Sequence, residues 1–316
     1  MFNSRLRSTL KKDFQRNYSL YIIVIPVIVY FLLFQYRPMY GALIAFKDFS
    51  PGRGFSGSLW LWDSRPGSHY YGFAHFVRFF RGPNFARVIR NTLLLNVYSL
   101  MWGFPAPIIL ALLLNEVRHS KYKRIIQTIT YLPHFISIIV IAGMITDFSL
   151  STGLFNDLIE SLGGRRFPLL QQPNLYRTIY IGSGIWQHVG WGTIIYLASL
   201  SAVDPQLYEA AKIDGAGKWM QLWNVTLPCI APTIIILLIL RIGGLMSEGH
   251  EKTLLLYNPA TYSVADIIST YVYRVGLLEQ NWSYSTAIGL FNSVINFSLL
   301  IVANNISRRV SETSLW

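Results

Sequence analysis

Long apolar runs constrain this chain more than any other feature of its sequence. A helix needs about 20 mostly apolar residues to cross the hydrocarbon core of a bilayer. Six stretches of the 316-residue chain approach that length, and buried helices of a soluble protein would explain one or two of them but not six. The six stretches are Tyr18–Tyr36, Thr92–Leu114, Ile125–Phe148, Ile179–Leu200, Ile230–Met246 and Ser283–Ala303. We therefore predict an all-α integral membrane protein with six transmembrane helices.

The composition favours the same class of protein. Hydrophobic residues make up 52% of the chain and charged residues only 13%, whereas soluble domains carry roughly 25% charged residues. The first apolar stretch is longer than the apolar core of a secretory signal, and no small-residue cleavage site follows it. We expect this stretch to be retained as a helix.

Six spans place both termini on one side of the membrane. Five basic residues precede the first span, and the loops on that side are short and rich in Lys and Arg. Cytoplasmic segments carry this bias, so we predict that both termini are cytoplasmic. The predicted segments are 1–17, the transmembrane domain 18–303 with outer loops 37–91 and 248–282 and a polar loop 201–228, and the tail 304–316. Within the first outer loop, the aromatic stretch 72–90 is expected to form an amphipathic helix on the membrane surface.

The polar loop has the pattern of two short amphipathic helices. Asp204-Pro205 is a favourable helix start, because Asp caps free N–H groups and Pro lacks the N–H that would stay unbonded. Gly215 is a natural place for a bend. Beyond it, Ala216, Trp219, Met220 and Trp223 follow helical spacing and predict a second apolar face. From pattern alone, such a helix pair could rest on lipid headgroups or could bind another protein.

The Gly-Ala-Gly-Lys string at 215–218 does not predict a nucleotide site. A phosphate-binding loop needs Gly-x-x-x-x-Gly-Lys followed by Ser or Thr. Here Lys212 occupies the position of the first glycine, and Trp219 follows Lys218. We therefore expect no ATP hydrolysis and no cofactor in this chain.

The same loop resembles a known family. Glu209-Ala210-Ala211, Asp214-Gly215-Ala216 and Leu227-Pro228 are similar to the EAA loop in the membrane subunits of ATP-binding-cassette (ABC) importers. Three further strings resemble the LplB-type branch, which imports oligo- and polysaccharides and includes alginate or uronate importers. These strings are 131–137 (YLPHFIS), 254–259 (LLLYNP) and 270–277 (TYVYRVGL).

The resemblance implies a type I ABC importer permease in a bacterial inner membrane. In that family the loop is a coupling helix that docks on an ATPase subunit, and Glu209 would supply the docking charge. Ala210 and Ala211 would form the close-contact face, with Gly215 as the bend between Asp214 and Ala216. The implied partners are a second permease subunit in a heterodimer, two ATPase subunits that bind ATP and Mg, an extracytoplasmic substrate-binding protein and membrane lipid. No nucleic acid is implied.

Polar residues within the spans are candidates for the substrate pathway, because polar groups facing lipid are costly and usually face a cavity or a partner. Hydrogen bonding between helices is an alternative role for each of them. The polar candidates are Gln187, His188, Arg241, Asn292 and Asn296, and the aromatic candidates for stacking on sugars are Trp186, Trp191, Tyr196 and Tyr271. His134 and His188 fall in different spans without further ligand residues nearby in sequence, so we expect no metal site.

Charge gives a hint about the cargo. The predicted outer segments hold 13 basic and eight acidic residues, a net charge of about +5. This surplus would attract an anionic sugar, and it would equally suit an acidic binding protein. The alternative function is a stand-alone secondary transporter or channel, which would favour repeats or discontinuous helices around ionisable groups at mid-membrane. A membrane enzyme is disfavoured, because the sequence shows no paired carboxylates and no nucleophile with its base.

Overall fold

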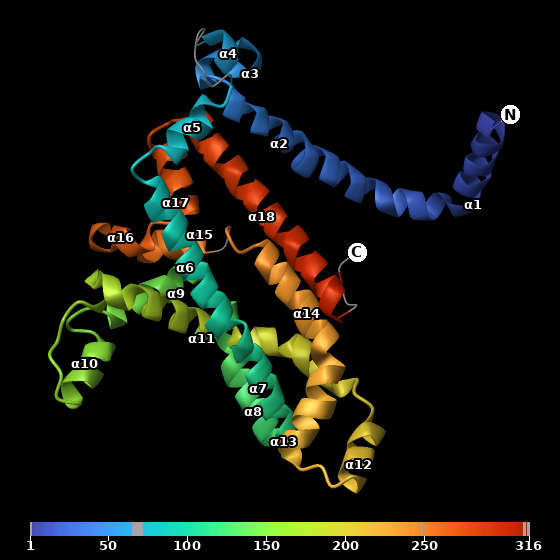
Figure 1. The fold of residues 1–316 in the computed structure, drawn as a ribbon, viewed down its shortest axis with the longest axis vertical. Helices are drawn as coiled ribbons and strands as arrows, with labels where there is room; N and C mark the ends of the chain where they lie inside the picture. The colour runs from blue at the N-terminus through green and yellow to red at the C-terminus, as the bar shows by residue number, and fades with distance from the viewer. Residues whose placement is uncertain (1, 65–71, 248, 312–313, 315–316) are drawn as a thin grey trace.

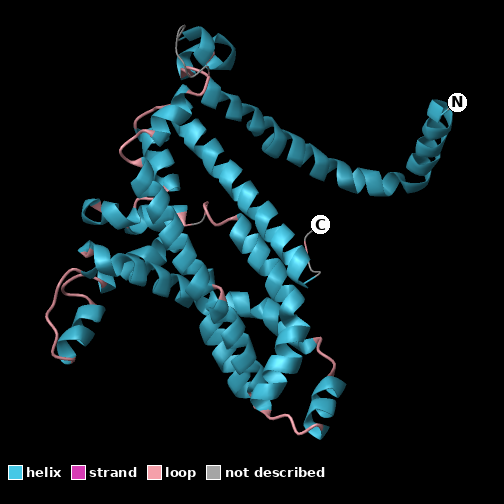
Figure 2. Cartoon of the chain, viewed as in Figure 1, coloured by secondary structure: helices cyan, strands magenta, loops and turns pink. Residues whose placement is uncertain are grey.

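The structure, a computed structural model, describes residues 2–64, 72–247, 249–311 and 314. In this part of the chain helices are the only regular elements, apart from an isolated antiparallel bridge between Lys47 and Trp60 (Figures 1 and 2). Residues 65–71 and 248 of the predicted outer loops, and most of 312–316 in the tail, lie outside the described residues.

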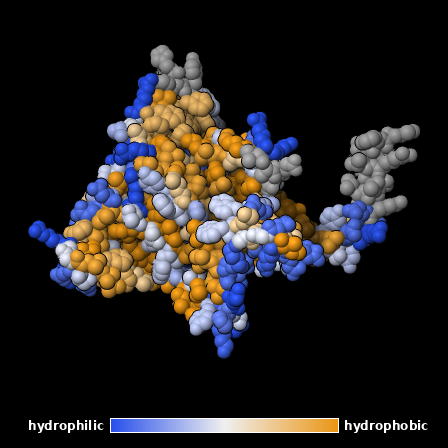
Figure 3. Space-filling view, turned by 60° about the horizontal axis from the view of Figure 1, so that its bottom comes forward, coloured by the Kyte–Doolittle hydropathy of each residue, from blue (hydrophilic) through white to orange (hydrophobic). Residues whose placement is uncertain are grey.

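Four helices of the described chain are long and apolar enough to cross a membrane. They are Asp13–Phe46, Phe85–Glu116, Lys218–Gly243 and Trp282–Arg309. They correspond to the first, second, fifth and sixth predicted spans, although the fifth ends at Gly243 rather than at Met246. Figure 3 shows hydrophobic residues over most of the face in view, as expected where lipid tails replace water.

Several of these helices are built from more than one element. The first contains α1 (Phe2–Phe31), η1 (Leu32–Tyr36), α2 (Arg37–Met39) and η2 (Tyr40–Phe46). The second joins α6 (Phe85–Gly103) to α7 (Pro105–Glu116). The others are α13 (Lys218–Gln221) with η6 (Leu222–Thr226) and α14 (Leu227–Gly243), and α18 (Trp282–Ser311).

The third predicted span is not one straight helix. α8 (Ser120–Tyr131) and η4 (Leu132–Phe135) meet α9 (Ile138–Phe148) at an angle of 99°. Ile136 has an extended backbone there, and the Ser137 hydroxyl accepts a hydrogen bond from the N–H of Ile139 to start α9. The apolar pattern predicted a span but could not reveal this break, because apolar residues continue on both sides of it.

The fourth predicted span lies within α11 (Pro173–Ser201), the central helix of the molecule. α11 carries Arg177, Gln187 and His188, and it is not among the helices whose apolar character alone predicts a crossing. It packs closely on its neighbours through glycines, since a side chain at Gly190 would collide with the Thr130 carbonyl of α8. Five predicted spans thus correspond to apolar helices or to the bent pair, while the fourth lies in a central, more polar helix whose composition alone does not indicate a crossing.

The remaining helices of the described chain are shorter. They are η3 (Pro51–Arg53), α3 (Gly54–Gly57), α4 (Leu61–Ser64), α5 (Ala74–Phe80), α10 (Leu154–Ser161), η5 (Leu169–Gln171), α12 (Pro205–Ile213), α15 (His250–Leu256), η7 (Pro259–Thr261), α16 (Tyr262–Ala265), α17 (Ile268–Tyr273) and η8 (Arg274–Leu278). α3 and α4 lie at the opposite end of the molecule from α12, while α1 extends away from the helical body (Figure 1).

The predicted surface helix over 72–90 is wrong as a single element. α5 ends at Phe80, a turn follows, and α6 begins at Phe85. Phe79 is 1% exposed and packs on Phe85 and on Phe291 of α18, with ring centroids 5.1 and 5.6 Å apart. These aromatic side chains therefore join α5 to α18 instead of facing lipid.

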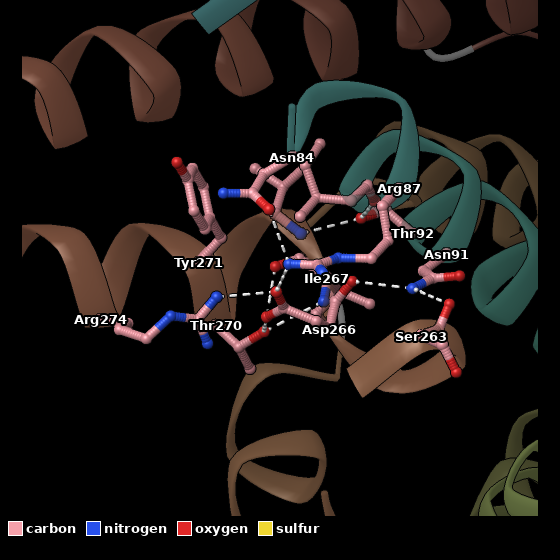
Figure 4. A network of polar contacts seen from close by, with 12 residues as sticks. Asn84, Arg87, Asn91, Thr92, Ser263, Asp266, Ile267, Thr270, Tyr271 and Arg274 are labelled. Atoms are coloured by element: carbon pink, nitrogen blue, oxygen red, sulfur yellow. Dashed lines mark hydrogen bonds and ion pairs between the residues drawn. The ribbon is translucent and has the colours of Figure 1, made fainter. Parts of the chain in front are cut away.

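A buried ionic network fixes the segment between α16 and α17 (Figure 4). Asp266 is fully buried and accepts hydrogen bonds from Arg274 at 2.7 Å, Thr270 at 3.0 Å and Arg87 of α6 at 3.2 Å. Thr92 of α6 accepts a further bond from the N–H of Ile268 at 2.9 Å. Because a buried carboxylate is stable only when paired, this network holds α17 against α6.

Candidate functional site

The predicted coupling loop begins with a well-capped helix, α12. The Asp204 carboxylate accepts a hydrogen bond from the N–H of Gln206 at 2.9 Å, as its position before Pro205 predicted. Tyr208 and Thr226 hydroxyls lie 3.1 Å apart and join α12 to η6. Local sequence therefore determines where this helix starts, and one long-range bond sets its position.

Gly215 ends α12 in a conformation that needs glycine. Its φ is +80°, in the left-handed region that side chains disfavour. The N–H of Ala216 bonds the carbonyl of Ala211 at 2.8 Å, and the N–H of Gly215 bonds that of Lys212 at 3.0 Å. This pair of bonds is the Schellman arrangement, so the predicted bend is a helix stop.

The prediction of a second, separate short helix in the loop is wrong. After Gly217 the chain enters α13, which continues through η6 into α14, so residues 218–243 form one long helix. The predicted face of Trp219, Met220 and Trp223 is well exposed at 56–76%. The loop is consequently one free short helix followed by the start of a membrane span.

The residues expected to contact an ATPase lie on the outside of this loop. Glu209, Ala210, Asp214 and Gly215 are exposed, while Ala211 and Ala216 are half-buried. A groove of about 620 Å³ runs between α7, α12 and α13 beside them. Two residues that line the groove, Lys218 of α13 and Glu116 of α7, form an exposed ion pair of 2.8 Å. The arrangement leaves the Glu209 carboxylate and an alanine surface open to a partner.

A second cavity of about 700 Å³ lies between α6, α7, α11, α14 and α15. Five of the predicted pathway residues line it together, and four of them come from α11. These five residues are Gln187, His188, Trp191, Tyr196 and Arg241. The structure therefore places side chains from two distant spans around one space.

The polar groups of this cavity are only partly paired. Gln187 is 4% exposed, and its Oε1 has no hydrogen-bond partner among the described residues. His188 Nδ1 lies 3.3 Å from His134 Nδ1, and the His134 ring stacks on Trp191 with centroids 4.5 Å apart. The two histidines that the sequence separates are thus neighbours. Among the described residues, no group of three or more His, Cys, Asp or Glu side chains is placed to hold a metal ion.

Four predicted pathway residues lie elsewhere. Tyr271 is 7% exposed and packs between Phe79 and Tyr284. Asn292 and Asn296 of α18 bond the backbone of Met246 at 3.2 and 2.9 Å and thereby hold the end of α14. Trp186 is 46% exposed and is not among the residues that line the cavity. For the two asparagines, the contacts are those of the alternative role, hydrogen bonding between segments.

The sequence prediction missed one cavity residue, Lys252 of α15. It was assigned only to an outer loop, yet its Nζ donates a 2.7 Å hydrogen bond to the carbonyl of Tyr180 and lies 4.7 Å from that tyrosine's ring. Burial lowers the pKa of the Lys252 ammonium to about 7. No local pattern in the sequence indicates that α15 folds inward against α11.

Comparison with known proteins decides the family. Residues 103–312 match the family described as the binding-protein-dependent transport system inner membrane component. The chain belongs to this family. It is 46% identical to Protein LplB of Bacillus subtilis (strain 168) over 303 residues, which are 96% of this chain and 92% of the relative. It is 44% identical to the polygalacturonan/rhamnogalacturonan transport system permease protein YteP of the same organism, over 97% of this chain and 92% of that one.

Solved structures agree with the sequence relatives. A chain of a bacterial alginate ABC transporter, crystallised with an alginate pentasaccharide-bound periplasmic protein, superposes with a TM-score of 0.86. That chain is 43% identical, over 96% of this chain and 99% of its own length. The protein is therefore a permease subunit of an ABC importer and not an enzyme, which excludes the stand-alone transporter or channel.

Proposed function

We propose that this permease imports acidic oligo- or polysaccharides. The observation that carries the proposal is the cavity at the central helix, which the basic residues Lys252 and Arg241 line together with Glu251. Relatives at 43–44% identity are described as transporting polygalacturonan and rhamnogalacturonan or alginate. A cavity lined by two basic side chains and by the aromatic Trp191 suits a chain of uronate sugars.

The coupling loop supports a specific assembly. Glu209 would pair with a basic group on an ATPase subunit, Ala210 and Ala211 would allow close approach, and the stop at Gly215 would orient α12. The ATPase subunits would bind ATP and Mg. Most of the Asp13–Phe46 span is exposed on this chain, with burial confined to its end around Ala45, so it is free to contact lipid and a second, different permease subunit.

The two ends of the molecule suit opposite sides of a bacterial inner membrane. α12 lies at the end opposite α3 and α4 (Figure 1). With α12 and both termini in the cytoplasm, the segments 37–91 and 248–282 would receive a substrate-binding protein on the outer side. The high density of basic residues before the first span favours this orientation.

Transport by the reconstituted complex tests the substrate class. Both permeases, the ATPase subunits and the cognate binding protein would be placed in proteoliposomes with ATP inside. We expect uptake of a galacturonate trisaccharide to exceed that of a neutral trisaccharide by at least about tenfold. Equal uptake of the two sugars would remove the acidic-sugar proposal while leaving the permease function intact.

A further inference from the structure

The position of α15 against α11 depends on a glycine. Gly249 precedes α15 with φ +84°, and any side chain there would collide with the Tyr180 hydroxyl. Tyr180 instead donates a hydrogen bond of 3.2 Å to the Gly249 carbonyl. The start of α15 is thereby held close to the cavity side of the central helix.

From this position the Lys252 ammonium reaches a defined place in the cavity. It is held by the Tyr180 carbonyl at 2.7 Å and lies 4.7 Å from the centroid of the Tyr180 ring. One turn further along α11, a Cβ at Gly184 would lie 3.2 Å from Nζ, so the glycine leaves room for the ammonium. No ion pair of the described residues involves Lys252. A partly buried cation with one backbone bond retains donors for a ligand.

Gln187 lies on α11 three residues beyond Gly184 and lines the same cavity as Lys252. Its Oε1 is buried without a partner, although buried polar atoms are almost always hydrogen-bonded. The same cavity is lined by Trp191, by Arg241 and by Glu251, which carries the one carboxylate among the described lining residues. The cavity thus offers an ammonium, an acceptor for a hydroxyl and an aromatic side chain within two turns of α11.

We infer that Lys252 binds the carboxylate of the sugar in transit and that Gln187 accepts a hydrogen bond from a hydroxyl of the same sugar. This inference rests on the proposed acidic substrate and names the residue that selects for it. A uronate unit carries both groups, and a charge-assisted hydrogen bond in a partly buried site is stronger than a neutral one. A bound carboxylate also restores the charged form of Lys252, whose pKa is lowered by burial.

The experiment uses the assembled importer in proteoliposomes with saturating binding protein loaded with galacturonate trisaccharide. Lys252→Gln is expected to lower the maximal uptake rate about tenfold, because a hydrogen bond to a charged group is lost. Lys252→Arg keeps the charge and is expected to stay within about threefold of wild type. Stimulation of ATPase activity by the loaded binding protein serves as the second readout, because it reports whether the importer is assembled and coupled.

Two matched controls separate a local site from general electrostatics and from packing. Arg165→Gln removes an exposed outer positive charge and is expected to change uptake less than twofold. In α11, Gly184→Ala pushes on the ammonium and is expected to lower uptake several-fold, whereas a Cβ at Gly182 meets nothing within 4 Å, so Gly182→Ala should match wild type.

Each outcome of this experiment has a distinct meaning. Wild-type uptake of a neutral trisaccharide but not of the galacturonate trisaccharide would overturn the proposed substrate class and this inference with it. Normal uronate uptake by Lys252→Gln, or an equal loss in Arg165→Gln, would overturn the role of Lys252 alone. A loss of both uptake and stimulated ATPase activity in Lys252→Gln that Lys252→Arg does not rescue would assign Lys252 to assembly and would likewise reject the site.

Discussion

The coupling loop and the cavity differ in how the chain builds them. α12 is determined within about a dozen residues, from the Asp204 cap to the Gly215 stop. The cavity instead takes Gln187 and Trp191 from α11, Arg241 from α14 and Lys252 from α15. A local element can be disabled by changing one surface side chain without harming the fold. A site assembled from distant helices depends on the contacts that hold those helices together.

The first prediction concerns the local element and has the largest expected effect on transport. Glu209→Lys reverses an exposed charge and should reduce ATP-driven uptake to background, since the docking pair with the ATPase becomes a repulsion. The variant should still insert and remain as thermally stable as wild type. Glu160→Lys, an equal charge reversal on exposed α10, is the control and should transport normally. Normal uptake by Glu209→Lys would mean that the loop does not carry the coupling contact.

The second prediction addresses the non-local region through its ionic network. Asp266→Asn would leave the partly exposed Arg87 and Arg274 against a buried neutral amide; breaking a fully buried pair costs about 3–5 kcal/mol, and the exposure of the two arginines lowers the cost here toward about 3 kcal/mol. We expect a large fall in the thermal unfolding temperature of the purified complex. Asp157→Asn removes one acid from the exposed pairing with Arg166 and should cost less than about 1 kcal/mol. Equal unfolding temperatures for the two variants would show that the buried network contributes no stability.

How far the sequence predicts each region follows from this difference. The six apolar stretches, the Asp204 cap and the position of the Gly215 bend were readable, because each depends on residues close together in the chain. The 99° break after η4 was not readable, since it interrupts a run that is apolar on both sides. Lys252 was missed and Tyr271 was placed in the pathway because burial is decided by packing between α5, α17 and α18 or between α11 and α15. The role of each of these residues therefore depends on contacts between segments far apart in the chain, which the sequence pattern does not show.

The third prediction tests the backbone of the local element. Gly215→Ala forces an L-residue to φ +80° and should cost about 1 kcal/mol, with a several-fold loss of uptake as α12 frays. The space around this position is open, so strain and not collision is the cause. Gly217→Ala is the matched control, because its φ of −69° suits any residue and its Cβ would also meet nothing within 4 Å. Similar uptake by the two variants would argue that α12 tolerates a different ending.

The last prediction uses pH to compare the cavity with the loop. With its pKa lowered to about 7 by burial, Lys252 is mostly charged at pH 6 and mostly neutral at pH 8. A charged ammonium binds a carboxylate more strongly, so uronate uptake by wild type should fall several-fold as pH rises from 6 to 8. In Lys252→Arg the guanidinium stays charged, and that part of the pH dependence should disappear. Uptake rates are measured across this range and divided by the stimulated ATPase activity. This ratio separates an effect of pH on the cavity from an effect of pH on the coupling loop. A pH profile unchanged by Lys252→Arg would show that the titrating group is not Lys252.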